Sequence, residues 1–112
     1  MRPILQVLAG FVSHVGANYT PAPGSYSATD NLAADGSDGA HYTVSADDTV
    51  VWTWSSTGNG PLTSSVVSGG NATSIEFSLK SSLIGGADRV RTITLTSGGN
   101  TWTIVLTAHS SS

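Results

Sequence analysis

The fold of this chain is decided near its C-terminal end, where residues 89–108 read RVRTITLTSGGNTWTIVLTA. Apolar and polar residues alternate on both sides of the Gly98-Gly99 pair, with the period of a β-strand that buries one face. Two glycines at the tip supply the positive φ angles of a type I′ hairpin turn. Pairing outward from that turn gives two cross-strand pairs on the apolar face, Leu95 with Trp102 and Ile93 with Ile104. The turn chemistry and the hydrophobic pattern therefore specify the same hairpin.

Two upstream segments alternate in the same way. TVVWTW at residues 49–54 and SIEFSLK at residues 74–80 each place apolar side chains on one face. No segment offers a helical stripe of useful length, and residues 81–88 have room for one turn at most. A sheet with one apolar face needs a second layer to cover it. The sequence therefore predicts an all-β fold, an antiparallel sandwich over residues 41–109 with Trp52 or Trp54 in its core, followed by a polar tail at 110–112.

Residues 1–40 lack this pattern and are predicted to form an N-terminal arm. Residues 4–12 are apolar on both alternating faces, which suits a strand buried on both sides or laid against a neighbouring subunit. A secretory signal peptide is the alternative, although Gln6 interrupts a short apolar run. Pro21, Pro23 and the glycines that follow indicate an extended arm or long loop over residues 18–40. The side chains expected to bind a partner are Ile4, Leu5, Val7, Leu8, Phe11, Val12, Tyr19 and Tyr26.

The composition excludes several classes of function. Serine, threonine and glycine supply 45 of the 112 residues, 10% of residues are charged, and there is no cysteine. The lack of cysteine excludes a disulfide framework, a thiolate metal site and a cysteine nucleophile. A net charge of -3 without a Lys/Arg cluster argues against a nucleic-acid partner. No run approaches the ~20 apolar residues of a membrane span, so no membrane partner is expected.

The sequence contains no convincing catalytic or metal-binding motif. His14, His41 and His109 are far apart and lack the spacing of zinc ligands. No G-x-S-x-G elbow marks a nucleophilic serine. We therefore predict no catalytic residue, no cofactor and no metal. A calcium site at three aspartates followed by turn-forming residues stays open as the less favoured reading, at Asp30, Asp35 and Asp38.

Two charged pairs have ordinary structural interpretations. Asp47-Asp48 stands between two predicted strands and indicates a turn. Arg89 and Arg91 begin a strand, where they serve either as a solvated or charge-guarded strand end or as a contact to an acidic partner. The first interpretation of the arginines is favoured.

Residues 41–107 resemble bacterial immunoglobulin-like β-sandwich domains of the BACON type. The resemblance rests on TVVWTWSS, on SGGNATSIEFSL and on a hairpin of the form R-x-x-x-I-x-[VL]-T-S-G-G, matched here by Arg89, Ile93, Leu95, Thr96, Ser97, Gly98 and Gly99. Ala108 stands where the family has a glutamine, and the N-terminal arm is additional. The resemblance implies an Ig-like sandwich. A free-standing copy is similar to the Ig-like accessory proteins that phages carry on capsids or tails.

These observations predict a non-enzymatic structural protein of a virion. The favoured form is a capsid decoration (cement) protein that binds the major capsid protein through its N-terminal arm and sandwich surface, with a homo-oligomer in the particle. The alternative is a secreted or cell-surface carbohydrate-binding module. That alternative requires signal cleavage near Ala17 and aromatic side chains exposed for stacking on sugar rings.

Overall fold

The computed structural model describes residues 17–29, 39–80 and 88–109. The described residues form seven β-strands and no helix, so they contain no helix able to cross a membrane. The all-β class predicted from the sequence is confirmed. The strands are β1 (Tyr19–Thr20), β2 (Gly24–Thr29), β3 (Gly39–Gly58), β4 (Leu62–Ser64), β5 (Gly70–Lys80), β6 (Arg89–Ser97) and β7 (Asn100–Ala108).

The strands form a mixed sheet of order β2-β7-β6-β3-β5-β4, with β1 beside β3. All neighbours are antiparallel except β2 and β7, which are parallel. The expectation of a wholly antiparallel sheet is therefore wrong at this pair. Parallel neighbours need a crossover connection, and here the crossover is the whole intervening chain. Alternation within each strand carries no information about such a distant partner.

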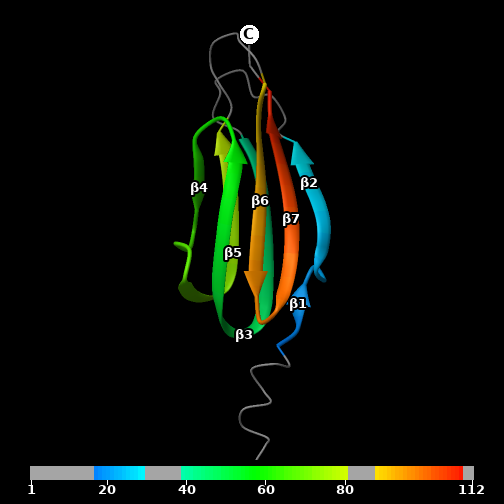
Figure 1. Cartoon of the computed structure of the whole chain (residues 1–112), viewed down its shortest axis with the longest axis vertical. Coiled ribbons are helices and arrows are strands. Elements are labelled where there is room, and N and C mark those ends of the chain that lie inside the picture. Colours follow the sequence, from blue (N-terminus) through cyan, green and yellow to red (C-terminus); the bar gives the residue numbers. More distant parts are fainter. Residues whose placement is uncertain (1–16, 30–38, 81–87, 110–112) are drawn as a thin grey trace, which may run out of the picture.

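β3 belongs to both halves of the sheet. Its first part pairs with β5 as far as Trp52, and its last part pairs with β6 from Thr53 onward. The β5 register shifts between Ser45 and Val50, and the sheet folds over on itself near this irregularity (Figure 1). One layer is β1-β3-β5-β4 and the other is β2-β7-β6-β3. Asp47 and Asp48 lie inside β3 at the irregularity, instead of in a turn between two separate strands.

The C-terminal hairpin has the predicted register. Leu95 pairs with Trp102 and Ile93 with Ile104. The φ angles of Gly98 and Gly99 are 58° and 83°, as the type I′ turn requires. We call the end of the sandwich that contains this turn and the β3 bend the base, and the opposite end the top.

The core lies between the two layers and is built around Trp52 and Trp102, both fully buried. Their ring centroids are 6.1 Å apart. Trp54 is half-buried and meets the Phe77 ring edge-on at 5.3 Å. The other fully buried hydrophobic side chains are Ala40, Val44, Ile75, Phe77, Leu79, Ile93, Leu95, Ile104, Leu106 and Ala108.

The N-terminal segment differs from the expected arm where it is described. Residues 19–20 and 24–29 are strands of the sheet, and residues 1–16 lie outside the described part. β2 has a short alternation, because half-buried Tyr26 and Ala28 follow exposed Ser25 and Ser27. This pattern is weak because it is short and follows two prolines.

Candidate interaction surfaces

Of the predicted partner-binding side chains, Tyr19 is half-buried and is part of the core packing. Its ring lies 4.9 Å from Trp102 and 5.8 Å from Trp52, edge-on to both. Its hydroxyl is 2.9 Å from Oγ of the buried Ser97. Tyr19 thus ties β1 to the hairpin. The six apolar candidates between Ile4 and Val12 lie outside the described residues.

Tyr26 closes one side of the sandwich together with Tyr42 of β3. The two rings stack at 5.5 Å with an interplanar angle of 29°, and both side chains are half-buried. The Tyr26 hydroxyl donates to the Ala22 carbonyl at 2.5 Å. Partial burial raises the pKa of Tyr42, and the neighbouring Tyr26 raises it further. Tyr42 is therefore neutral at physiological pH, and its ring makes an aromatic contact with Tyr26 between the layers.

The described histidines do not form a catalytic or metal site. His41 Nδ1 is 2.8 Å from Ser78 Oγ and 3.9 Å from Glu76 Oε2. A Ser-His-acid triad needs the serine and the acid on opposite ring nitrogens, whereas here both lie on the same one. His109 lies near Asp88 instead, with Nε2 and Oδ2 3.6 Å apart.

The possible metal ligands lie partly inside and partly outside the described residues. Within residues 17–29, 39–80 and 88–109 no group of three His, Asp or Glu side chains is placed to hold an ion. The candidate calcium ligands Asp30, Asp35 and Asp38 lie outside these ranges, and so does His14.

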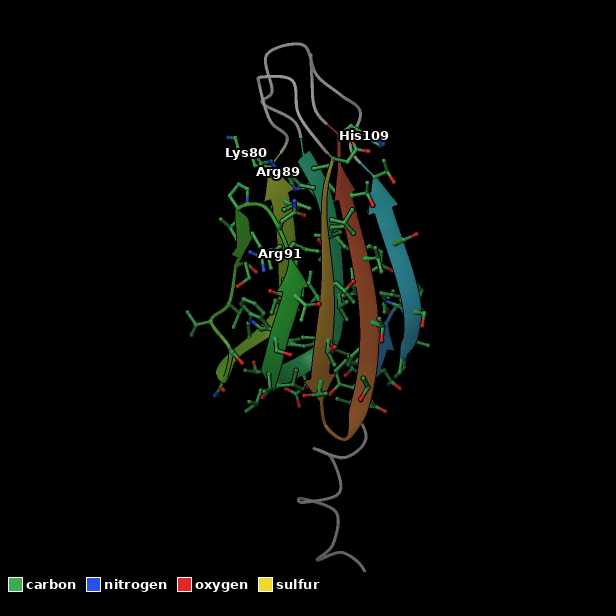
Figure 2. The ribbon with its side chains drawn as sticks, turned by 45° about the horizontal axis from the view of Figure 1, so that its top comes forward. Lys80, Arg89, Arg91 and His109 are labelled. Atoms are coloured by element: carbon green, nitrogen blue, oxygen red, sulfur yellow. The ribbon has the colours of Figure 1, made fainter. Side chains whose placement is uncertain are left out.

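Cationic side chains gather at the top. Figure 2 shows Lys80, Arg89 and His109 at this end, with Arg91 set deeper. Arg91 donates from Nε and Nη2 to the Gly60 carbonyl at 3.1 and 2.9 Å. β6 lies between β7 and β3, so Arg91 does not guard a free edge. It fixes the turn after β3, as its further bond from Nη1 to Ser56 Oγ at 3.2 Å also shows.

The outer surface of the β2-β7-β6-β3 layer carries no charge along its four strands. Its side chains alternate with the buried ones, and cross-strand neighbours fall in register, for example Thr94 between Ser55 and Thr103. Twelve of its fourteen side chains bear hydroxyls and two are valines. We call this surface the hydroxyl face: Ser25, Ser27, Thr29, Thr53, Ser55, Thr57, Val90, Thr92, Thr94, Thr96, Thr101, Thr103, Val105 and Thr107.

The described part of the molecule has a surface hollow toward each end. One at the base has a volume of about 360 Å³ and is lined by Tyr19, Thr49, Val50, Val51, Asn71, Ser97 and Gly98. The other, near the top, has about 260 Å³ and includes His41, Thr63, Ser78 and Lys80. The second is below the ~300–1,000 Å³ of ordinary small-molecule sites, so we assign it no ligand.

The tryptophans offer no platform for sugar rings. Trp52 and Trp102 are fully buried. The half-buried Trp54 donates from Nε1 to the Val66 carbonyl at 3.0 Å. The large hydrophobic side chains exposed in the described ranges are aliphatic: Val51, Val67 and Val90.

Asp47 anchors the start of the described chain. Its Oδ1 accepts from the Asn18 amide and its Oδ2 from Asn18 Nδ2, both at 2.9 Å. The Asp47 amide in turn donates to the Asn18 carbonyl at 3.0 Å. The backbone hydrogen bond from Asn18, followed by the side-chain one, lowers the pKa of Asp47 below its ordinary value of 3.8.

We expect this anchor to open in acid. A folded-state pKa below the unfolded value gives a contribution that is present above the unfolded value and is lost as pH falls through the folded pKa. The carboxylate is exposed, so the effect is local to Asn18. An NMR titration should place the Asn18 amide step at a midpoint below 3.8. In Asp47→Asn that step should vanish; a step that persists, or a midpoint above 3.8, would contradict the assignment.

Sequence reasoning missed the hydroxyl face as a surface, because the alternation in each strand shows only that strand's own polar side chains. The strand order is what joins them. It also missed the bend of β3. Asp47-Asp48 marks the position of this bend, but the sequence pattern indicated a turn between two strands there. Comparison of the sequence with models of protein families and with curated proteins finds no match.

Proposed function

We propose that the protein is a non-enzymatic structural protein of a virion, most specifically a capsid decoration protein with an immunoglobulin-like sandwich. The strand order supports the Ig-like part. Ig-type sandwiches join strands A-B-E-D in one sheet and C-F-G in the other. The layers β1-β3-β5-β4 and β3-β6-β7 have this order if β3 supplies both B and C. A buried tryptophan near the start of C is also typical, and Trp52 lies there.

The observation that carries the proposed role is the hydroxyl face. Burying a charge at an interface requires a partner charge, and interface cores are accordingly depleted in charged residues. A four-stranded surface without charge can be covered by another protein at little desolvation cost. Many copies can also repeat on one particle with weak mutual repulsion, since the chain carries a net charge of only -3.

The proposal divides the work between two parts of the chain. The hydroxyl face lies on the major capsid protein, and the apolar segment 4–12 extends to a neighbouring subunit. Hydroxyl and methyl groups of threonine suit a broad contact of this kind, because each side chain offers both a hydrogen-bonding group and an apolar one.

A charge placed in the centre of the hydroxyl face tests the role. We expect Thr94→Arg to weaken binding to undecorated capsids of the encoding virus by at least about tenfold, or 1.4 kcal/mol, because a buried unpaired charge is costly. Binding is measured by co-sedimentation of the purified protein with capsids.

The matched control is Thr43→Arg on the outer surface of the other layer, where the position is also exposed and pairs with Glu76. It should bind like the wild type. Equal binding by both variants would exclude the hydroxyl face as the docking surface, and a wild-type protein that does not sediment with capsids would refute the decoration role.

A further inference from the structure

The outer edge of β2 has no strand beside it in the described part of the chain. A two-residue hairpin makes Ser97 and Asn100 a hydrogen-bonded pair, and bonding alternates from there along an antiparallel ladder. The backbones of Thr103, Val105 and Thr107 therefore face β2. In the parallel register of β2 with β7, these backbone groups bond with those of Gly24, Tyr26 and Ala28. The backbone groups left pointing outward belong to Ser25, Ser27 and Thr29.

The same alternation also accounts for hydrogen bonds along β3, which borders β6 on the side away from β7. This agreement supports the assignment of the outward backbone groups of β2. The alternation predicts that Asn59 pairs with Val90 and that the Trp54 amide points away from β6. The Asn59 amide does donate to the Val90 carbonyl at 3.0 Å. The Trp54 amide donates outward, to Ser68 Oγ at 2.9 Å.

Most other edges of the described sheet are short or covered. β4 has three residues and follows Pro61, and β1 has two and precedes Pro21. The outer edge of β3 after Trp52 is met by residues 66–69, as the Trp54 bonds show. Short strands, prolines and covering loops are the usual protection of sheet edges.

Two edges flank the side closed by Tyr26 and Tyr42. One is β2, which is open over six residues and contains no charge and no proline. The other is β3 before Ser45, which β1 covers from Ser45 onward. That stretch of β3 lies beside Glu76 and Lys80 of β5. The uncharged β2 edge is thus the better match for an uncharged, apolar strand.

The direction of β1 bears on which strand could reach the β2 edge. β1 runs antiparallel to β3, and Asn18 continues that ladder opposite Asp47. The line from Thr20 back to Asn18 therefore points toward the β3 bend and out of the base. A return to β2 of the same molecule would require a reversal, whereas another molecule can be reached directly.

We propose that the β2 edge is a strand-docking site whose occupant is segment 4–12 of a second copy of this chain. The segment reads ILQVLAGFV and carries no charge. Extended, its nine residues span about 30 Å, enough to cover the six residues of β2. Strand addition supplies main-chain hydrogen bonds to the outward groups of Ser25, Ser27 and Thr29. Alternate apolar side chains then cover the half-buried Tyr26 and Tyr42.

This inference deepens the proposed assembly role by naming one partner and the edge that holds it. Each copy donates one segment and presents one edge. Such a contact is heterologous, and it produces rings if the rotation closes and open chains if it does not.

A complementation experiment with two full-length variants tests the proposal. Ser27→Pro removes one outward amide and leaves the β2–β7 ladder intact, and a proline is tolerated on an edge strand whose amide faces solvent. Leu8→Asp places a charge in the donor segment. Wild type should associate with rising concentration in sedimentation experiments. Each variant alone should associate at least about tenfold more weakly, because its own donor or its own edge is defective.

An equimolar mixture of the two variants should give a 1:1 complex and nothing larger, since one variant supplies an intact edge and the other an intact segment. Ser27→Ala, which keeps the amide, should behave like the wild type. Thr43→Pro on the β3 edge should also associate normally; loss of association in Thr43→Pro but not in Ser27→Pro would move the site to β3 and overturn the proposal.

Hydrogen exchange gives a second measurement that does not depend on the proline variant folding. In the wild type the Ser25 and Ser27 amides should become protected as concentration rises, and in Leu8→Asp they should stay unprotected. A wild-type protein that remains monomeric, or amides protected equally at all concentrations, would place the segment on its own molecule or elsewhere and refute the inference. No capsid is present in these experiments, so their outcome is independent of the capsid-binding test.

Discussion

Replacing Trp102 with alanine should lower the free energy of unfolding by about 3–5 kcal/mol. The side chain is fully buried and its ring contacts Tyr19 at 4.9 Å and Trp52 at 6.1 Å. Its Nε1 donates to the Pro21 carbonyl at 3.0 Å. The substitution therefore leaves a large cavity and removes a hydrogen bond that joins β7 to the connection between β1 and β2. Since a small domain is stable by only about 5–15 kcal/mol, much of its stability would be lost.

Two variants bracket this result in urea denaturation. Trp102→Phe keeps most of the packing and loses the hydrogen bond, so its loss of stability should be smaller. Val67→Ala changes a side chain that is 76% exposed and should stay within about 0.5 kcal/mol of the wild type. A loss for Trp102→Ala no greater than that for Val67→Ala would contradict the assigned core.

Gly58→Ala should be the second severe change. Gly58 has a φ of 118°, and an added Cβ would stand 2.1 Å from the Val90 carbonyl oxygen. Because the clashing oxygen belongs to the backbone, relieving this contact requires β3 and β6 to move apart. We expect a loss of about 1–2 kcal/mol from the left-handed backbone and a further ~1–3 kcal/mol from overpacking.

Gly69→Ala is the matched control, because Gly69 has a φ of 94° and open space around its missing side chain. It should lose only the backbone part. The difference between the two variants in chemical denaturation isolates the close approach of β3 to β6. Equal losses would show that this approach costs nothing and that the turn after β3 relaxes freely.

The parts of the fold that could be predicted are those in which local chemistry and periodicity agree. In the C-terminal hairpin, Gly98-Gly99 fixes the turn and thereby the register, so the pairing of Leu95 with Trp102 follows from neighbouring residues alone. Alternation placed Trp52 and Trp54 on the same apolar face and predicted that one of them lies in the core; the structure buries Trp52 fully and Trp54 in part.

The remaining features depend on contacts between distant parts of the chain. The pairing of β2 with β7 joins residues about 80 positions apart in the sequence. Five of the six residues of β2 are small, and its alternation is weak, so tertiary contacts of Tyr26 with Tyr42 and of β2 with β7 determine its state. The sequence predicted two strands separated at Asp47-Asp48, because two acidic residues usually end a strand. In the structure Asp47 lies inside β3 and is stabilised there by its hydrogen bonds to Asn18.

The candidate surfaces also combine features that the sequence could predict with features that depend on the strand order. Each row of alternating threonines was visible along its own strand, yet strand order alone decides that four such rows lie side by side. The open edge of β2 likewise exists only because β2 is last in that order. The donor segment, by contrast, was apparent from its apolar residues alone, and its docking remains a prediction.

The parallel pairing of β2 and β7 has a mechanical consequence. β2 begins near the base and β7 ends at the top, and the two strands run side by side in the same direction. A pull on Gly24 toward the base and on Ala108 toward the top would therefore slide one strand along the other. The ladder bonds lie across the direction of such a load and must break together, instead of opening one after another as they do when a hairpin is unzipped. β2 and β7 thus form a shear-resistant clamp against forces applied along the strands.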